Sequence, residues 1–346
     1  MEPSVSFKSC PPHVICLGEA LVDRLGPLGG DPVIDKPVVD CFGGAPANVA
    51  CGLANLGIPV AFVGRLGDDE IGQNFMHLML RRGVKLEGCQ LDSSRPTRVV
   101  LVKRDFDGER VFQGFLGNQG QGFADQALRI DELIDSWALI AQQAKWLIIG
   151  SIPLASKASS EALLWVIQKA IDSGIHIALD VNWRPTFWEQ KFFPDSPPDE
   201  ASSQAIANLF HQASLLKLAR EEAIWFFKTD DPSKISSSLP KAPDVVVTDG
   251  ARPIRWIIDG FMGQLNALSP NVVIDTTGAG DAFTAGLIHQ LLNVSSSKLD
   301  LEKVCEMVQF AAACGALVCS GSGAIDPQPK KFEVQEFVAS ISSPES

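Results

Sequence analysis

The sequence predicts an α/β fold with a mostly parallel central sheet. Short, wholly apolar runs recur along the chain, and segments with helical spacing of apolar residues lie between them. The chain is also long enough, at 346 residues with 46% hydrophobic content, to bury a substantial core. Strands and helices that alternate in this way form a parallel sheet covered on both faces, which explains why the predicted strands are apolar throughout.

The predicted strands each consist of one short apolar run, at 13–18, 60–67, 145–152, 175–182, 213–219 and 244–250. The predicted helices repeat apolar residues every three or four positions, at 47–57, 70–83, 160–174 and 221–228. The first three of these helices end at glycine, a common C-terminal stop. Because no repeat or linker interrupts the chain, we predict a single domain over residues 1–346.

Two segments break the alternation. Residues 22–44 are rich in glycine and proline, and residues 97–117 contain two β-type runs joined around Asp107-Gly108, a strong hairpin signal. We predict that together they form a small antiparallel sheet inserted into the α/β body. Such an insertion could be decoration, but a sheet that projects beside a binding crevice more often acts as a lid, and we favour the lid.

The composition excludes several kinds of partner. Forty-one acidic against 29 basic residues give a net charge of −12, and no basic block could neutralise a run of phosphates or anionic lipids. We therefore expect neither nucleic acid nor a membrane as a partner. The eight cysteines form no C-x-x-C pair, which favours reduced thiols and a cytoplasmic protein. We expect no secretion signal and no transmembrane segment, because no stretch reaches the ~20 apolar residues that span a bilayer.

The stretch DTTGAGDAF, residues 275–283, carries the clearest chemical pattern. Gly278, Ala279 and Gly280 have almost no side chain, and the apolar spacing after them predicts a helix that begins at this turn. Free N–H groups and the helix dipole at such a turn form an anion site suited to a phosphate. Asp281 could accept a proton from an attacking hydroxyl. The residues alone also allow Asp281 to be only a partner of the helix dipole, and the chain has no Walker A motif.

DTTGAGDAF resembles the C-terminal signature of the ribokinase-like sugar kinases, also called the phosphofructokinase-B family. The segments GEALVD (18–23) and GGAPANVACGLANLG (43–57) resemble its N-terminal signatures and are closest to the fructokinase branch. The resemblance covers about residues 13–330 and implies a ribokinase-like three-layer α/β/α domain with a β-sheet lid. In that family the glycine turn is the anion hole and the following aspartate, here Asp281, is the base.

The N-terminal signatures imply an acceptor site. The resemblance places Asp23, Gly44 and Asn48 in contact with the sugar, and Gly43 lets the chain turn tightly beside it. The residues alone also allow an ordinary turn at the two glycines, with Asn48 as the cap of the following helix. A further sugar contact is expected at Asn118.

That last assignment comes from residues 115–128, FLGNQGQGFADQAL, which replace a polar segment typical of fructokinases. Asn118 and Asp125 are the candidate matches, and the alignment needs a change of length.

Further segments imply the phosphate and metal sites. GRLGDDEIG (64–72) and DVNWRP (180–185) resemble family elements, and Arg184 suits a transferring phosphate because its fork pairs with two oxygens; a structural salt bridge is the alternative. The glutamate that supports Mg²⁺ and its waters corresponds to Glu222, although Ala219 stands where the family motif has Asn.

The resemblance also implies a nucleotide site. The residues placed there are Asn182, Lys217, Glu222, Thr248, Gly250, Gly278, Gly280 and Gly323. Asp275 and Thr277 could in addition support K⁺, which family members often bind near this element.

We therefore predict an ATP-dependent sugar kinase, a phosphotransferase with an alcohol acceptor, that uses Mg²⁺ and makes fructose 6-phosphate. The sugar's primary hydroxyl loses its proton to Asp281 while Arg184 and the turn at Gly278 to Gly280 hold the γ-phosphate. The alternatives are another kinase of the family, acting on ribose, a keto-deoxy sugar acid or a nucleoside, and a catalytically silent relative that binds or regulates. The expected partners are ATP and a small sugar, together with a second copy of the chain through the lid.

Overall fold

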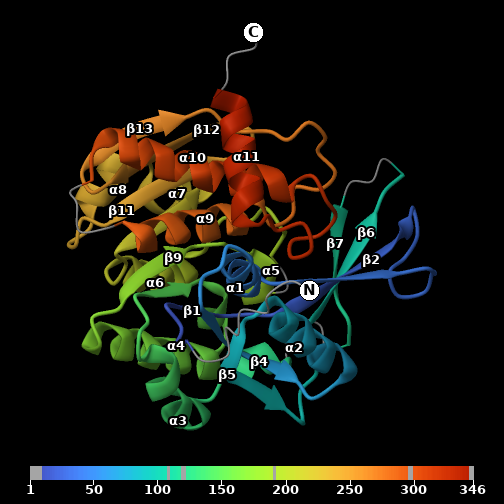
Figure 1. The fold of residues 1–346 in the computed structure, drawn as a ribbon. Coiled ribbons are helices and arrows are strands. Elements are labelled where there is room, and N and C mark those ends of the chain that lie inside the picture. Colours follow the sequence, from blue (N-terminus) through green and yellow to red (C-terminus); the bar gives the residue numbers. More distant parts are fainter. Residues whose placement is uncertain (1–9, 107–109, 118–121, 190–191, 295–298, 343–346) are drawn as a thin grey trace, which may run out of the picture.

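The computed structural model describes residues 10–106, 110–117, 122–189, 192–294 and 299–342. Within these residues one large sheet has the strand order β13-β12-β11-β10-β9-β8-β1-β4-β5 (Figure 1). Neighbouring strands from β11 to β5 run parallel, and β12 and β13 add an antiparallel edge. The strands are β1 (Val14–Leu17), β4 (Val60–Gly67), β5 (Lys85–Asp92), β8 (Trp146–Ile149), β9 (His176–Asp180), β10 (Leu215–Ala219), β11 (Asp244–Asp249), β12 (Arg252–Ile258) and β13 (Phe261–Leu265).

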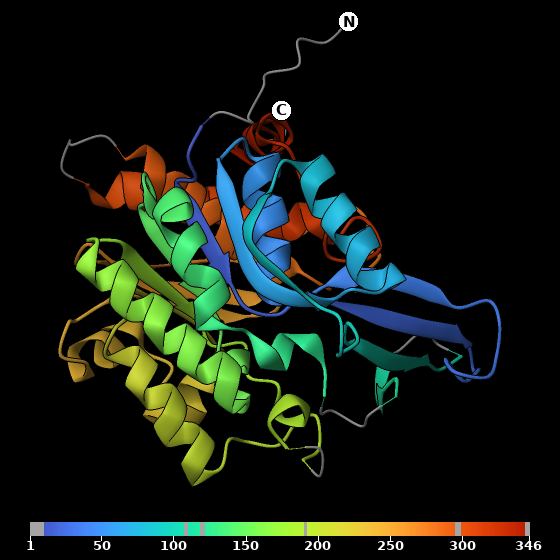
Figure 2. The ribbon, with the colours of Figure 1, turned by 90° about the horizontal axis from the view of Figure 1, so that it is seen from below.

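Helices cover both faces of this sheet (Figures 1 and 2). Alternate residues of β1 point to opposite cores, Val14 and Cys16 to one and Ile15 and Leu17 to the other. The first core is closed by α1 (Ala45–Asn55), α2 (Glu70–Arg82), α9 (Ala279–Asn293), α10 (Leu301–Val318) and α11 (Lys331–Ser342). The second is closed by α3 (Ile130–Ala141), α4 (Lys157–Asp172), α6 (Glu200–Phe210), α7 (Arg220–Phe227) and α8 (Pro232–Ser238). The predicted three-layer α/β/α arrangement is confirmed.

A second, smaller sheet projects from one side of the body, as Figures 1 and 2 show. Its order is β3-β2-β6-β7, and its strands are β2 (Leu21–Leu28), β3 (Val39–Gly43), β6 (Val99–Arg104) and β7 (Arg110–Phe115). These strands fall in the two segments predicted to form the lid. The prediction of a purely antiparallel sheet is wrong, because β2 and β6 pair in parallel. The chain enters both strands from the main sheet, so both run outward in the same direction. The predicted hairpin tip at Asp107-Gly108 lies outside the described residues.

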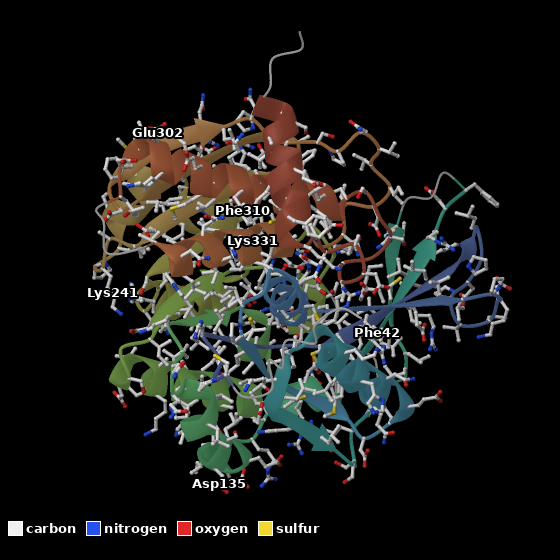
Figure 3. The ribbon with its side chains drawn as sticks, in the orientation of Figure 1. Phe42, Asp135, Lys241, Glu302, Phe310 and Lys331 are labelled. Atoms are coloured by element: carbon white, nitrogen blue, oxygen red, sulfur yellow. The ribbon has the colours of Figure 1, made fainter. Side chains whose placement is uncertain are left out.

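Local signals explain where several elements end. Asp69 caps α2 by accepting a hydrogen bond from the Gly72 N–H at 2.8 Å, and Gly83 ends that helix with a left-handed φ of 88°. Charged side chains such as Lys241 and Glu302 lie on the outside of the molecule, whereas Phe310 is buried between helices (Figure 3).

Among the described residues no helix is both long enough and apolar enough to cross a bilayer. Two short 3-10 turns, η2 (Ala124–Ala127) and η3 (Ile152–Ala155), and the short α5 (Pro185–Trp188) complete the elements.

Candidate active site

A cavity of about 550 Å³ lies where the lid sheet meets the carboxyl ends of the parallel strands. Most of the residues that the sequence predicted for the site line it: Asp23, Gly44, Asn48, Asn182, Arg184, Lys217, Glu222, Thr248, Thr277, Gly278, Ala279, Gly280 and Asp281. Five predicted site residues are not found among those that line it. Gly43, Gly250, Asp275 and Gly323 do not line the cavity, and Asn118 lies outside the described residues.

The predicted glycine turn is the start of α9. Gly278 precedes the first residue of this helix with a left-handed φ of 80°, and no side chain caps the helix end, so first-turn N–H groups are available to a ligand. The tight packing explains the small residues. A Cβ on Gly278 would come within 2.6 Å of Ala324, and one on Gly280 within 3.2 Å of the Lys217 ammonium nitrogen.

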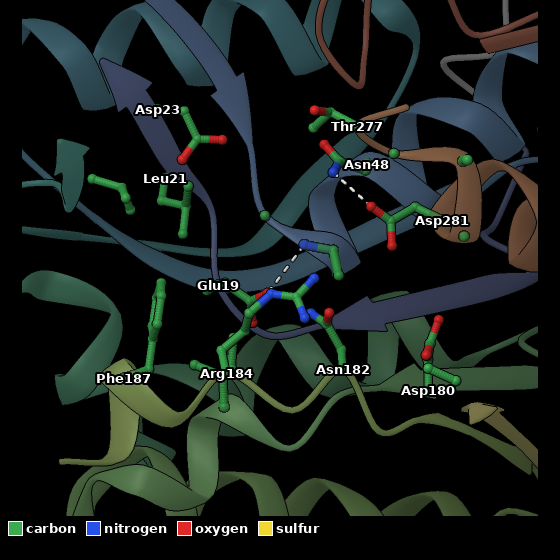
Figure 4. A pocket seen from close by; sticks show the side chains of 18 of the residues that line it. Glu19, Leu21, Asp23, Asn48, Asp180, Asn182, Arg184, Phe187, Thr277 and Asp281 are labelled. Carbon is green, nitrogen blue, oxygen red and sulfur yellow. Dashed lines mark hydrogen bonds between the residues drawn. The ribbon is translucent and has the colours of Figure 1, made fainter. Parts of the chain in front are cut away.

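Asp281 lies in the first turn of α9 and faces the cavity. Its Oδ2 accepts a hydrogen bond from Asn48 Nδ2 at 2.7 Å (Figure 4). Burial raises the pKa of Asp281 to about 6, and the negative charge of Asp180 adds to this, while the Asn48 bond and the charges of Lys217 and Arg184 oppose it. Asn48 is inside α1, whose N-cap is Gly44, so the capping alternative for Asn48 is wrong. Asp281 lies in the first turn of α9, as the helix-dipole alternative requires, and it has the Asn48 bond in addition.

A buried ion pair supports the turn from below. Lys217, on β10, lies 2.8 Å from Asp180 Oδ2 at the end of β9, and Thr284 Oγ1 donates to the same oxygen at 3.1 Å. Burial alone lowers the pKa of the Lys217 ammonium, but the Asp180 carboxylate more than offsets this and the pKa is raised. Lys217 therefore stays charged beneath the first turn of α9, where a phosphate would lie.

Glu222 holds the ends of two strands together. One carboxylate oxygen accepts from the Trp183 N–H at 2.7 Å and the other from the Ala219 N–H at 2.8 Å. Burial, with the nearby Asp180 charge, raises the pKa of Glu222. The bond to Ala219 uses only the backbone of that residue, so the loss of the family's Asn side chain at this position leaves the contact intact.

Arg184 enters the cavity from the loop after β9. Asn182 has a left-handed φ of 45°, rare for a residue with a side chain, and it turns the chain so that Arg184 points into the cavity (Figure 4). In the part of the chain that is described, no carboxylate forms an ion pair with Arg184, and its guanidinium donates to the Trp183 carbonyl at 3.0 Å. The salt-bridge alternative therefore does not describe this arginine.

The acceptor side of the cavity is built from β2 and the turn before α1. An added Cβ on Gly43 would lie 3.8 Å from Asp23 Oδ2 and 4.0 Å from Asn48 Oδ1, so these two side chains converge over that glycine. Gly44 has a φ of 108°, and a Cβ there would strike the Glu19 carbonyl oxygen at 2.5 Å. Burial raises the pKa of Asp23 to about 6, against the opposing charges of two arginines.

The lid touches the body through a second arginine. Arg110, on β7, lines the cavity, donates to Asp275 Oδ2 at 2.5 Å and donates to Thr277 Oγ1 at 2.8 Å. The other bonds to the Asp275 carboxylate come from the N–H and hydroxyl of Thr277 and from the Gly323 N–H. These partners hold the pKa of Asp275 below its usual range although burial opposes the shift. The lid, the glycine turn and the loop at Gly323 thus meet at one carboxylate.

The described parts of residues 115–128, the segment that contains Asp125, take part in an unusual cluster. Arg98, which is 2% exposed, forms two bonds to Asp125, at 2.7 and 3.0 Å, and its guanidinium lies 4.6 to 5.0 Å from the ring centres of Phe115, Phe123 and Phe187. Both Asp125 oxygens are therefore used by Arg98, and Asp125 does not line the cavity. Phe187 does, so this cluster forms part of the wall.

Among the charged residues that line the cavity, sequence reasoning did not single out Glu19 or Arg110. Glu19 lies in GEALVD, but no feature of the neighbouring sequence distinguishes a ligand-binding glutamate there from a purely structural one. Arg110 follows the predicted hairpin tip, and only the fold brings it to Asp275, 165 positions away. Its place in a segment predicted to form the lid was the available signal.

The fold and the cavity define a class: an α/β enzyme with an anion-binding helix start and a buried carboxylate under a lid. The comparisons with known proteins agree. Residues 11–331 match the pfkB family of carbohydrate kinases, and the chain belongs to that family. It is a phosphotransferase with an alcohol group as acceptor.

Two kinds of relative are similar over nearly the whole chain. "Probable fructokinase-6, chloroplastic" of Arabidopsis thaliana is 34% identical over 330 residues, 94% of this chain and 82% of that protein. A fructokinase with bound ATP from Xylella fastidiosa has a TM-score of 0.79 at 26% identity, with 95% of this chain and 99% of that chain covered. A fructokinase double mutant from Vibrio cholerae O395, with fructose, ADP and potassium bound, has a TM-score of 0.74 at 27% identity over 94% and 98% of the two chains.

Proposed function

We propose that the protein transfers the γ-phosphate of ATP to the primary hydroxyl of D-fructose and so makes fructose 6-phosphate. The observation that carries this proposal is the position of Asp281. Its carboxylate lies beside an uncapped helix start and in contact with Asn48, which converges with Asp23 over Gly43. A base, an anion site and directional contacts for sugar hydroxyls thus share one cavity.

In this proposal Asp281 accepts the proton of the attacking hydroxyl. The Arg184 side chain and the N–H groups of the turn at Gly278 to Gly280 hold the transferring phosphate, and Lys217 adds a fixed positive charge beneath them. The nucleotide is placed along Asn182, Thr248, Gly250 and Gly323. Closure of the lid sheet excludes water, the competing acceptor.

Mg²⁺ fits the residues present. Among the described residues no group of three or more acidic, histidine or cysteine ligands could cage a metal ion, which agrees with an ion held mainly by phosphates and water. Glu222 lies at the cavity with both oxygens fixed by backbone N–H groups, and we propose that it holds the waters of the ion. When bound, Mg²⁺ would neutralise part of the negative charge of the phosphates.

The K⁺ hypothesis for Asp275 and Thr277 fits the residues less well. Each oxygen of the Asp275 carboxylate already accepts two hydrogen bonds, and one of the donors is the Arg110 guanidinium. A second cation there would meet a filled carboxylate and a like charge. We derive no step through K⁺.

The test is a panel assay of ADP release with fructose, ribose, glucose, adenosine and keto-deoxygluconate. We expect fructose to give the highest kcat/KM. A clear preference for ribose, the nucleoside or the sugar acid would replace fructose by that acceptor. An absence of ADP release with every acceptor would favour a catalytically silent relative and contradict the proposal.

We propose that the chain works as one kinase domain, with lid segments at about 22–44 and 97–117, and as a homodimer through the lid. Exposed apolar side chains on the lid, among them Leu28, Val39 and Val111, support that contact, and light scattering of the purified protein tests it.

We also propose a cytoplasmic location, supported by eight free cysteines and tested by imaging of the tagged chain.

A further inference from the structure

Glu19 is a buried acid in the floor of the cavity that the mechanism above does not use. It lies between β1 and β2, is 3% exposed, and lines the cavity (Figure 4). One oxygen, Oε1, accepts a hydrogen bond from the Ala45 N–H at 3.0 Å, in the turn that begins α1. The other oxygen, Oε2, is fully buried and has no hydrogen-bond partner among the described residues.

A second polar atom in the same cavity is equally unsatisfied. Asn48 donates its Nδ2 to Asp281, but its Oδ1 is buried without a partner in the part of the chain that is described. Buried polar atoms are nearly always hydrogen-bonded, because leaving one unpaired destabilises the fold by about 1–3 kcal/mol. Among the described residues that line the cavity, Glu19 and Asn48 are the two with a buried side-chain atom that lacks a partner, which indicates that a bound ligand completes them.

The chemistry of the two atoms is complementary. The amide oxygen of Asn48 can only accept a hydrogen bond, whereas a neutral carboxyl at Glu19 can donate one. Burial raises the pKa of Glu19 to about 8, and the acids that face it, Asp125 on η2 and Asp281 on α9, add to this against two backbone N–H groups. Arg184 points into the same cavity from the end of β9. Glu19 is therefore mostly neutral at pH 7.

We propose that Glu19 is a direct contact to the acceptor, with Oε2 donating a hydrogen bond to one sugar hydroxyl while Asn48 Oδ1 accepts one from a hydroxyl. The inference rests on the proposed function and adds a residue to its acceptor site. The Ala45 N–H donates to Glu19 Oε1 and so holds the Glu19 carboxyl against the turn that carries Gly44. Glu19 Oε2, the proposed donor to the sugar, is therefore held at a fixed distance from this turn. A sugar would thus meet Asp23 on one side and Glu19 on the floor.

The experiment compares Glu19→Met, Glu19→Gln and the wild type in steady-state kinetics with fructose and ATP. Met removes both hydrogen-bonding functions, so the KM for fructose should rise at least ~10-fold while the KM for ATP stays within about twofold. Gln keeps one donor and one acceptor in nearly the same shape, so the fructose KM should stay within about threefold. The exposed Glu302→Gln on α10 is the matched control for loss of a carboxylate.

A pH series gives a second, independent test that needs only the wild type and Glu19→Gln. Above a pH of about 8 the wild-type carboxyl ionises and loses its donor, so its fructose KM should rise. The amide of Glu19→Gln does not titrate, so its KM should stay flat over the same range. This arm decides the question even if Glu19→Met does not fold, which circular dichroism will show.

Two outcomes would overturn the inference: an unchanged fructose KM in folded Glu19→Met, or the same alkaline rise of KM in Glu19→Gln as in the wild type. Failure of the proposed function looks different. A wild type that releases no ADP with any acceptor refutes the kinase proposal itself, whereas an active wild type with either of the two outcomes refutes only the role of Glu19.

Discussion

The two ends of the cavity differ in how completely their polar groups are satisfied. At the glycine turn the charged side chains are paired: Asp281 with Asn48, and Asp180 with both Lys217 and Thr284. At the acceptor end, Glu19 Oε2 and Asn48 Oδ1 are buried without partners among the described residues. The turn is thus preorganised for one fixed chemistry, while the acceptor end keeps hydrogen bonds open for a ligand to complete.

This difference separates reaction type from substrate choice. A paired network can hold Asp281 and the anion site in place whatever hydroxyl arrives, because its bonds are internal. Unpaired atoms reject a ligand that cannot bond to them, so discrimination between sugars should depend mostly on the acceptor end. Substitutions at the two ends should therefore change different kinetic constants.

The largest expected effect is that of Asp281→Asn. An amide cannot accept the proton of the attacking hydroxyl, so kcat should fall between about 100- and 10,000-fold while nucleotide affinity is retained. Asp300→Asn is the matched control, because Asp300 also begins a helix but caps it at the surface. Steady-state kinetics measure kcat, and a nucleotide titration measures the affinity for ATP. An Asp281→Asn enzyme with near wild-type kcat would contradict the assignment of Asp281 as the base.

Lys217→Met should have the next largest effect, on stability. Removal of the ammonium leaves the Asp180 carboxylate buried without its cation, which should reduce the free energy of unfolding by about 3–5 kcal/mol. Urea denaturation measures this. Adding Asp180→Asn removes the unpaired charge, so the double variant should recover part of the stability, and a double variant that is less stable than Lys217→Met would argue against the ion-pair explanation.

Asn48→Ala should change both ends at once. Its bond lowers the pKa of Asp281 from the value that burial would set, so the acidic limb of kcat, expected near pH 6 in the wild type, should move to higher pH. Below that pKa the base is protonated and inactive. Because a hydrogen bond to a charged group is lost, kcat/KM for fructose at pH 7 should fall about 10- to 100-fold.

A pH–rate profile measures the shift, and Asn55→Ala is its control. Asn55 lies on the same helix but donates to the Gln328 carbonyl, away from Asp281. An unmoved acidic limb in Asn48→Ala would separate this asparagine from the base.

Much of the main sheet and the glycine turn could be predicted from the sequence, because the information there is local. Apolar runs, helical spacing and terminal glycines each act within a few residues, and the structure confirms the strands and helices they predicted. Asp281 and its turn are likewise contiguous. A family resemblance then placed Asn48 and Asp23 at the same site, which no local pattern could do.

What could not be predicted depends on contacts between distant segments. Asn48 and Asp281 are 233 positions apart, and only their meeting shows that Asn48 orients the base rather than capping a helix. The parallel pairing of β2 with β6 depends on both strands leaving the main sheet in the same direction. Glu19 becomes notable only when burial leaves one of its oxygens unpaired. Burial of this kind is a property of the fold and leaves no mark in the sequence.

The smallest expected effect is that of Arg110→Met, which removes the contact between the lid and Asp275. The arginine side chain is 30% exposed, so the ion pair is screened and the loss should raise the KM values for ATP and fructose only about two- to fivefold. The control is Arg24→Met, because Arg24 forms its ion pair with Asp40, and both residues lie on strands of the lid. A lid contact predicts a larger effect from Arg110 than from Arg24. The same variant also tests the K⁺ hypothesis. Without Arg110, Asp275 Oδ2 keeps only its bond from the Gly323 N–H and loses the neighbouring positive charge. Replacing choline by K⁺ at constant ionic strength should therefore stimulate Arg110→Met more than the wild type. Equal stimulation of both enzymes would show that Arg110 does not occupy the place of a cation.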